Sequence, residues 1–352
     1  MSLNRTTYEE STPVIEEIRR EHNLPGLAAA VTRNEGIIAA GAAGVRVIDG
    51  HAQVTVADRF HIGSVTKPMT ATMIATLVEA GKLSWTTTPV DVFPDWKQQI
   101  HPPLQGITLE QLLTHRAGLL PLETDEEIDR LPRFNGDPAE VRLLLAEWLL
   151  RQGNVSPVGE HVYSNAGYGL AAVLAEGASG RSWESLMQSL LFQPLEIESA
   201  GFGWPARTHA DEPWGHRETE TGFAPHSPND DYQLVPFVAP AGDVHVNIID
   251  FARFAHLHLA GLNGKSTFLQ TATFEKLHTP NGEYALGWYA QQIRELPAST
   301  HSGSAETFLA GVIVYPPKDV AIVIALNAAG ERVREARDKL FGLLLRKFGA
   351  IT

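Results

Sequence analysis

Hydrophobic and polar positions follow a strand pattern near the N-terminus, next to one helical segment. Residues 11–23 predict a helix, because Ser11 and Thr12 can cap its start and Pro13 suits its first turn. Residues 27–45 are rich in small and β-branched apolar side chains around a polar turn. This second pattern predicts two adjacent strands.

The C-terminal region combines strands and a helix in the same way. Residues 307–329 contain two apolar runs around a Pro-Pro-Lys-Asp turn, which predicts a hairpin of two buried strands. Residues 331–348 predict an amphipathic helix that closes the chain. One stripe of this helix is apolar and holds Val333, Ala336, Leu340 and Leu344.

Helical patterns dominate the middle of the chain. They cover residues 70–79, 108–115, 138–152, 167–179, 182–192 and 249–261.

We therefore predict an α+β fold, in which both termini build one antiparallel sheet with flanking helices. The sheet domain would comprise residues 1–80 and 280–352, and the inserted, mostly helical domain residues 81–279. A long segment near 201–240, rich in Pro, Gly, His and Trp, predicts irregular structure, and such loops often wall a functional site. We expect that site at the interface of the two domains.

Composition narrows the classes of function. The 352 residues include 43% apolar and 20% charged side chains and carry a net charge of −13, with no basic cluster beyond the C-terminal Arg-Lys-Phe-Gly. This balance disfavours a nucleic-acid partner, which requires a basic surface to neutralise phosphates. The absence of cysteine excludes disulfides, thiolate metal sites and a cysteine nucleophile.

Targeting signals are missing from the sequence. The N-terminal residues lack the apolar run of a signal peptide, which favours a cytoplasmic over a periplasmic or secreted location. No stretch is apolar enough for a membrane-spanning helix. The sequence indicates no particular oligomeric state.

The first candidate for chemistry is Ser64, three residues before Lys67. Pro68 is tolerated only in a first helical turn, so the helix should begin at about Ser64, and Gly81 provides its end. Lys67 then lies one turn along on the same face, where an uncharged amine could accept the seryl proton. The alternative is a capping serine beside a solvated lysine, and this segment alone favours that alternative.

Two further segments strengthen the catalytic interpretation. Tyr163 and Asn165 flank Ser164 in a Gly-rich loop that leads into a helix, and side chains two residues apart in an extended stretch project to the same side. His301-Ser302-Gly303 precedes an apolar strand, and Gly303 would let a substrate approach the backbone closely.

With these motifs in this order, the chain resembles the serine penicillin-recognising superfamily. The resemblance is to the branch of class C β-lactamases, D-Ala-D-Ala carboxypeptidases, D-aminopeptidases and related esterases, and it extends from about Val14 to about Leu345. It includes "FHIGSVTKPMTA", "ITLEQLLTHRAGL" and "GEHVYSNAGYGLAAVLAEGASGRSW". The class A branch is less similar, because Tyr163-Ser164-Asn165 stands where that branch has Ser-Asp-Asn.

The resemblance implies a β-lactamase/transpeptidase-like fold and a role for each motif residue. Ser64 would be the acylated nucleophile, Lys67 and Tyr163 the proton-transfer pair, and Asn165 would orient Lys67 or the acyl amide. The backbone N–H groups of Ser64 and Ser304 would form the oxyanion hole. His301 and Ser302 would line the strand edge beside the acyl portion of the substrate. No cofactor is implied.

Three departures from the family pattern bear on the substrate. His301 replaces the lysine of a Lys-Thr-Gly motif and is mostly neutral near pH 7, so the cation that attracts a β-lactam carboxylate is lost. We therefore expect a small ester, amide or peptide substrate of the esterase or D-amino-acid peptidase type, with β-lactamase activity as the alternative. Glu306 and Thr307 replace small residues, which would disfavour anionic substrates and narrow the cleft, and Asp243 stands where relatives often have glycine.

Two other classes of function compete with this interpretation. The 14 histidines suggest a metal hydrolase, but His256 and His258, the densest pair, are two apart on a predicted helix and face different directions. We therefore expect no metal site. A non-catalytic, penicillin-binding-like module is the second alternative, although Ser64, Lys67 and Tyr163 are all present.

Overall fold

A seven-stranded sheet forms the centre of the computed structural model, which describes residues 9–230 and 234–349. Its strand order is β1-β3-β2-β12-β11-β10-β9, and every pairing is antiparallel except the parallel pair of β1 and β3. The strands are β1 (Glu9–Glu10), β2 (Gly26–Arg33), β3 (Gly36–Gly44), β9 (Tyr289–Ile293), β10 (Leu296–Ser304), β11 (Leu309–Tyr315) and β12 (Val320–Leu326).

Both ends of the chain meet in the middle of this sheet, where β12 pairs with β2 from Leu27–Leu326 to Thr32–Ala321. Alternate residues of β12 belong to different hydrophobic clusters: Ile322 lies with the cluster of α1 and α13, and Val323 with the cluster on the other face. This period of two explains why both apolar runs of the C-terminal hairpin are buried throughout. The predicted α+β fold with a sheet built from both termini is confirmed.

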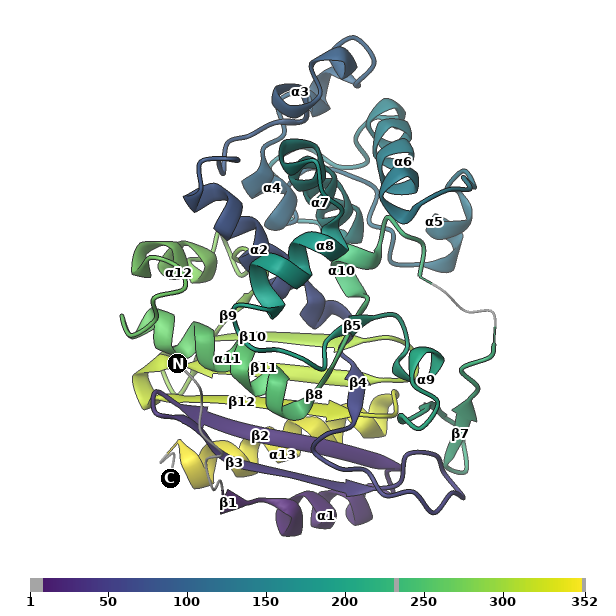
Figure 1. The fold of residues 1–352 in the computed structure, drawn as a ribbon, viewed down its shortest axis with the longest axis vertical. Coiled ribbons are helices and arrows are strands. Elements are labelled where there is room, and N and C mark those ends of the chain that lie inside the picture. The colour runs from purple at the N-terminus through teal and green to yellow at the C-terminus, as the bar shows by residue number, and fades with distance from the viewer. Residues whose placement is uncertain (1–8, 231–233, 350–352) are drawn as a thin grey trace.

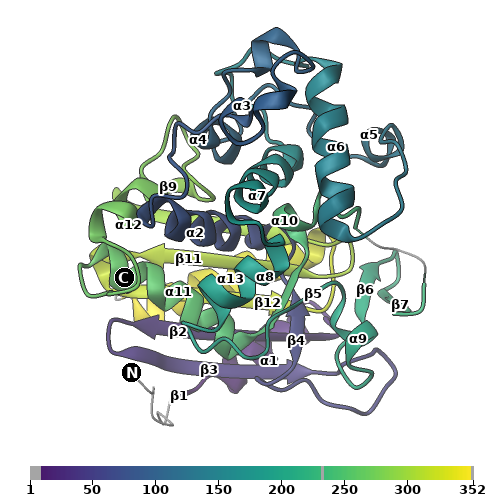
Figure 2. The ribbon, with the colours of Figure 1, turned by 45° about the horizontal axis from the view of Figure 1, so that its top comes forward.

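Helices cover both faces of the sheet (Figures 1 and 2). Helices α1 (Thr12–Glu21) and α13 (Glu331–Phe348) contribute Ile15, Ile18 and Leu340 to the core of one face. Helix α11 (Ile248–Leu262) contacts β2 and β12 on the other face. It packs on the sheet although it lies inside the range 81–279 that we assign to the inserted domain, and the division into two domains stays a prediction.

The remaining helices gather mainly at the end of the molecule opposite β1 (Figure 1). They are α2 (Thr66–Glu79), α3 (Pro89–Val92), α4 (Leu109–Leu113), α5 (Asp125–Asp129), α6 (Pro138–Gln152), α7 (Asn165–Ser179), α8 (Trp183–Met187), α9 (Pro205–Thr208), α10 (Ala239–Gly242) and α12 (Thr271–His278), with a π-helical turn at Gln188–Phe192 and 3₁₀ turns at Gly63–Val65, Pro94–Trp96, Pro102–Leu104 and Pro316–Lys318.

Short strands occupy much of the sequence between the helices. Strand β8 (Val244–Asn247) pairs with β4 (Arg59–His61) and β5 (Gly201–Phe202), and β6 (Gly215–Glu218) pairs with β7 (Phe223–His226). The segment 201–240, which the sequence predicts to be irregular, therefore contains several short elements joined by loops. Their brevity explains why no strand or helix pattern is visible there.

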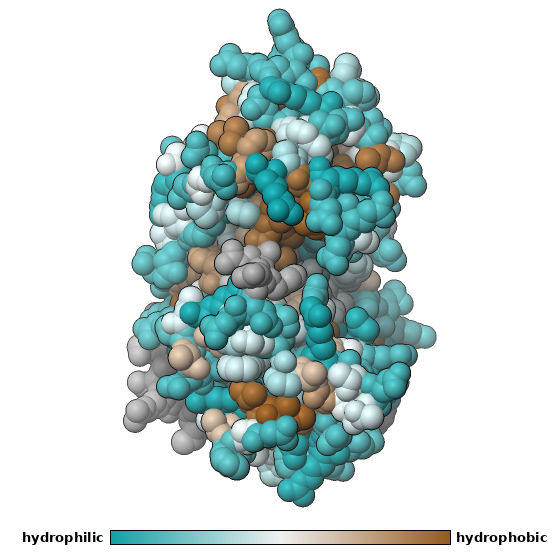
Figure 3. All heavy atoms as spheres, turned by 90° about the vertical axis from the view of Figure 1, so that its right-hand side faces the viewer, coloured by the Kyte–Doolittle hydropathy of each residue, from teal (hydrophilic) through white to brown (hydrophobic). Residues whose placement is uncertain are grey.

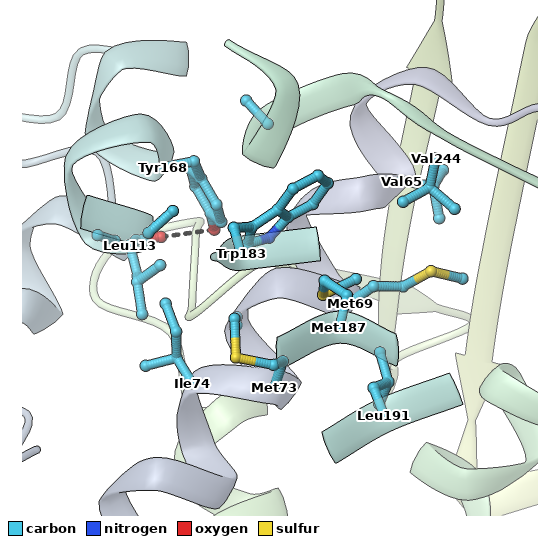
Figure 4. Packing of buried hydrophobic residues seen from close by; sticks show 14 of the residues in the cluster. Val65, Met69, Met73, Ile74, Leu113, Tyr168, Trp183, Met187, Leu191 and Val244 are labelled. Atoms are coloured by element: carbon cyan, nitrogen blue, oxygen red, sulfur yellow. Dashed lines mark hydrogen bonds between the residues drawn. The ribbon is translucent and has the colours of Figure 1, made fainter. Parts of the chain in front are cut away.

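Helix α2 is surrounded on nearly all sides by other parts of the protein. Eleven of its 14 residues are buried, so it is apolar nearly all round rather than amphipathic. Met69 and Met73 of α2 lie among Trp183, Met187 and Leu191 (Figure 4). The first turn of α2 is therefore fixed by dense packing, which favours precise placement of Ser64 and Lys67.

Candidate active site

Ser64 and Lys67 lie at the entry to α2. Ser64 belongs to the 3₁₀ turn Gly63–Val65, and α2 itself begins at Thr66, two residues later than the sequence predicts. A tightened first turn of this kind is common at helix starts and leaves the two residues on one face. The Lys67 Nζ atom lies 3.0 Å from Ser64 Oγ.

Two further oxygens hold the Lys67 amine. Its Nζ donates to Asn165 Oδ1 at 2.7 Å and to the carbonyl oxygen of Ala241 at 3.0 Å. An uncharged amine has two N–H donors and one lone pair. With both donors directed to these oxygens, the lone pair is free to accept a hydrogen bond from the Ser64 hydroxyl.

Burial favours the uncharged form of this amine. The Lys67 side chain is completely buried, which lowers its pKa well below the ordinary value of a lysine. The charge of Glu123 opposes this shift to a smaller extent. Lys67 thus has the geometry and the electrostatic environment of a general base for Ser64.

Tyr163 lies on the other side of the lysine. The Lys67 Nζ atom is 4.7 Å from the centre of the Tyr163 ring, and the centre of the His115 ring lies 4.3 Å from that of Tyr163, with the two rings tilted by 36°. Burial raises the pKa of Tyr163 above its ordinary value, while a hydrogen bond with Ser64 partly opposes the shift. The phenol therefore remains protonated near neutral pH and can donate a proton.

Asn165 connects three segments that are distant in the sequence. Its Nδ2 donates to the carbonyl oxygen of Leu122 at 2.8 Å, while its Oδ1 accepts from Lys67. The preceding Ser164 caps α7 by accepting from Gly167 N. Capping by Ser164 thus explains why the polar pair Ser164-Asn165 stands at the start of α7. The side-chain amide of Asn165 is held by hydrogen bonds at both its oxygen and its nitrogen.

Strand β10 crosses close to the serine. A Cβ added at Gly303 would lie 2.0 Å from the Ile62 carbonyl oxygen and 2.6 Å from Ser64 N, and one added at Gly63 would lie 2.6 Å from Ser304 N. Only glycine permits this contact of backbones. It brings the N–H groups of Ser64 and Ser304 to the same place, as an oxyanion hole requires.

The side chains of His301 and Ser302 point to opposite faces of β10. His301 is buried, with Nε2 3.1 Å from Tyr284 Oη, and burial, aided by Lys67, lowers its pKa to about 3. Ser302 Oγ accepts a hydrogen bond from Arg337 of α13. His301 therefore provides no positive charge, and the Ser302 hydroxyl is directed toward α13.

The edge of β10 beside Ser64 is open. Strand β9 pairs with β10 only from Leu296 to Thr300, so residues 301–304 face no neighbouring strand on that side in the described part of the chain. The free N–H and C=O groups of such an edge can pair with an extended substrate.

Asp243, Glu306 and Thr307, which depart from the family pattern, differ in their neighbours and burial. Asp243 Oδ1 lies 3.3 Å from His61 Nε2, beside the turn that carries Ser64. Glu306 forms an exposed ion pair with Arg217. Thr307 is fully buried against Gly215, so its side chain does not narrow the cleft as the sequence suggested.

A cavity of about 570 Å³ lies next to this site. Its walls include Phe202, Leu234, Ala239 and Asp243. A Cβ added at Gly242 would lie 3.9 Å from both Leu234 Cδ1 and the carbonyl carbon of Gly63, which places the cavity wall beside the Ser64 turn. Hydrophobic residues gather in a hollow on the side of the molecule where α9 and β7 lie (Figure 3).

Sequence reasoning missed Glu123 and the Ala241 carbonyl group. Glu123 follows Leu122, whose carbonyl oxygen binds Asn165, and its charge acts on both Lys67 and Tyr163. The sequence gives no signal for either group, because each reaches Lys67 only through the tertiary fold.

Within 9–230 and 234–349, no three or more His, Asp and Glu side chains are grouped so that they could hold a metal ion. No helix in these ranges is long and apolar enough to cross a membrane.

The fold, with a serine and a lysine at the junction of sheet and helices, is that of the penicillin-recognising serine hydrolases. The sequence profile of the β-lactamase family matches residues 12–346. A β-lactamase of Escherichia coli (strain K12) is 30% identical over 314 residues, which cover 86% of this chain and 74% of that protein. The chain therefore belongs to the β-lactamase family.

Other relatives and solved structures carry different names. Penicillin-binding protein 4 of Amycolatopsis lactamdurans is 30% identical over 69% of this chain, and unguisins hydrolase ungD of Aspergillus violaceofuscus is 24% identical over 91%. This chain spans 61% and 62% of their lengths. The structure of SurE superposes with a TM-score of 0.76 at 26% identity, covering 96% of this chain and 75% of that one.

A class C β-lactamase from Rhodobacter sphaeroides superposes with a TM-score of 0.75 at 22% identity, covering 95% of this chain and 98% of that one. This similarity concerns the fold. The sequence-based prediction that the chain belongs to the penicillin-recognising superfamily is thus confirmed.

Proposed function

We propose that the protein hydrolyses a small ester or amide through an acyl-enzyme on Ser64. One observation carries the proposal: the completely buried Lys67 amine lies 3.0 Å from Ser64 Oγ, with its other contacts arranged for an uncharged base. Membership of a serine hydrolase family supports hydrolysis as the reaction type.

In the proposed reaction, Ser64 Oγ attacks the substrate carbonyl carbon while its proton passes to Lys67 Nζ. The oxyanion that forms accepts hydrogen bonds from Ser64 N and Ser304 N, each typically worth about 3 kcal/mol. Tyr163 then passes a proton to the leaving alcohol or amine and is reprotonated from Lys67, as the C–O or C–N bond breaks. Water attacks the acyl-enzyme, and the acid product and free Ser64 are released.

His301 favours an esterase or D-amino-acid peptidase over a β-lactamase. A buried imidazole with a pKa of about 3 carries no charge at neutral pH and is turned toward Tyr284. A carboxylate beside the leaving group would therefore find no cation at this position. A crystal structure of the similar protein SurE contains D-Leu, which supports a substrate with a D-amino-acid group.

True β-lactamase activity is the second candidate, because the Escherichia coli relative that covers most of the chain is named a β-lactamase. A chromogenic cephalosporin and a p-nitrophenyl ester, assayed side by side, separate the two. We expect the ester to be turned over much faster. If the cephalosporin is hydrolysed as fast as the ester or faster, β-lactamase activity becomes the preferred assignment.

Ser64→Ala tests the nucleophile itself. A fluorophosphonate should add one covalent adduct to the wild-type protein, detected by intact mass, and none to the variant. Ser84→Ala is the matched control, because Ser84 is exposed beyond the end of α2 and its replacement should leave labelling intact. Labelling of the Ser64→Ala protein would refute the assignment, and an unlabelled wild type without ester turnover would favour the non-catalytic module.

A further inference from the structure

We propose that Glu123 binds a positively charged group of the substrate, so that the preferred ester or amide carries an ammonium group near the reacting carbonyl. This inference rests on the proposed acyl-enzyme function of Ser64. It assigns a specificity role to a residue that neither the motifs nor the family comparisons single out.

The position of Glu123 is set by the site itself. Asn165 binds the preceding backbone twice, through its N to the Pro121 carbonyl oxygen and through its Nδ2 to that of Leu122, both at 2.8 Å. Leu122 is buried and adopts a left-handed conformation with φ of 55°. A non-glycine residue rarely adopts this conformation, which must be held by surrounding structure and is found preferentially at functional sites.

Glu123 is exposed, yet its charge reaches several groups of the site. It acts electrostatically on Lys67, Tyr163 and Tyr289, which come from three separate segments. Because Asn165 binds both the Lys67 amine and the Leu122 carbonyl oxygen next to Glu123, these interactions agree with a position of Glu123 near the Ser64–Lys67 pair.

The carboxylate of Glu123 has no partner of its own. Among residues 9–230 and 234–349, it takes part in no hydrogen bond or ion pair, whereas its backbone N donates to Glu127. The neighbouring Glu126 is paired with Arg130. An exposed, unpaired carboxylate near the Ser64–Lys67 pair is available for a cationic ligand.

Other titratable groups of the cleft leave this charge uncompensated. Burial is the main cause that lowers the pKa of His115 well below its ordinary value and that of His301 to about 3, so both imidazoles are uncharged at neutral pH, and burial also lowers the pKa of Lys67 well below its ordinary value. The Glu123 carboxylate thus lies near two uncharged histidines and a lysine whose charged form is disfavoured by burial. A cationic substrate is attracted there, while an anionic one is repelled.

Two matched pairs of esters test the proposal at neutral pH. Alanine benzyl ester, taken as the faster enantiomer, is compared with benzyl isobutyrate, in which a methyl group replaces the ammonium group. Acetylcholine is compared with 3,3-dimethylbutyl acetate, which places the charge in the leaving alcohol instead. We expect wild-type kcat/KM to favour the cationic member of at least one pair.

Glu123→Gln should reduce that preference by about ten- to hundredfold, as loss of a charged contact does. The neutral ester is an internal reference: removing the charge of Glu123 also shifts the pKa of Lys67, but this affects both members of a pair equally. Glu126→Gln is the control variant and should retain the preference.

The outcomes separate this inference from the proposed function. If Glu123→Gln leaves both ratios unchanged while hydrolysis still requires Ser64, the role of Glu123 is wrong and the acyl-enzyme function stands. If Ser64→Ala hydrolyses the esters as fast as the wild type, the proposed function itself fails.

Discussion

At the scale of single residues, the proposed reaction depends on the protonation state of Lys67. The same side chain on a surface would be a protonated cation, but its complete burial lowers its pKa and its three oxygen neighbours fix the amine. The sequence placed Lys67 one turn from Ser64, whereas the change in its protonation follows from the tertiary environment.

The first prediction concerns the pH dependence of ester hydrolysis. Only the deprotonated amine can accept the seryl proton, so kcat/KM for a neutral ester should rise as pH increases through the lowered pKa of Lys67. Lys67→Arg keeps a permanent charge and should reduce kcat/KM by about 10²- to 10⁴-fold. Both are measured from pH–rate profiles.

Lys82→Arg provides the control for this prediction. Lys82 is exposed just beyond the end of the same helix, and its replacement should leave the profile unchanged. A Lys67→Arg protein with the wild-type rate would show that the lysine is not the base.

At the scale of elements, helix packing positions the two active-site segments. Helix α7 carries Asn165 at its start and contacts both α2 and α6. A buried arginine links this group: Arg142 of α6 forms ion pairs with Glu176 of α7 at 2.7 Å and Glu184 of α8 at 2.8 Å. The Arg142 side chain is fully buried, so its charge depends on both partners.

We predict that Arg142→Met destabilises the protein by about 3–5 kcal/mol, because it leaves Glu176 and Glu184 without a counter-charge. Urea unfolding followed by circular dichroism measures the effect. In contrast, Arg130→Met breaks an exposed pair with Glu126 and should change the unfolding free energy by less than about 0.5 kcal/mol. Similar small effects for both variants would contradict a structural role for the buried ion pairs of Arg142 with Glu176 and Glu184.

At the scale of the whole molecule, several buried histidines are held uncharged in different elements. Burial lowers the pKa of His278 and His301 to about 3 and that of His245 to about 4. In the unfolded chain these groups titrate near pH 6.5. Between those values the unfolded state binds more protons, so the folded state loses stability as pH falls.

We therefore predict that the free energy of unfolding decreases below about pH 6.5, by up to about 1.4 kcal/mol per pH unit for each such histidine. His278→Gln should reduce this slope, since it removes one titrating group that hydrogen-bonds His258 and Ser299. Urea unfolding at pH 7.5, 6 and 5 measures the slope. The exposed His51→Gln serves as control, and a wild-type stability independent of pH in this range would disprove the prediction.

The sequence by itself determined the local features of this protein. Pro13 and Pro68 located the starts of α1 and α2, the apolar runs located β2, β3, β11 and β12, and three short motifs in one order identified the family. These signals are readable because each depends on residues a few positions apart.

Only the tertiary structure decided which distant groups meet. The Lys67 amine binds Asn165 and Ala241, which lie 98 and 174 positions further along the chain, and Asn165 holds the backbone that presents Glu123. The fold also turned His301 toward Tyr284 and placed α11 on the sheet. The physical reason is that burial and long-range contacts, rather than local residue pattern, set side-chain direction and protonation.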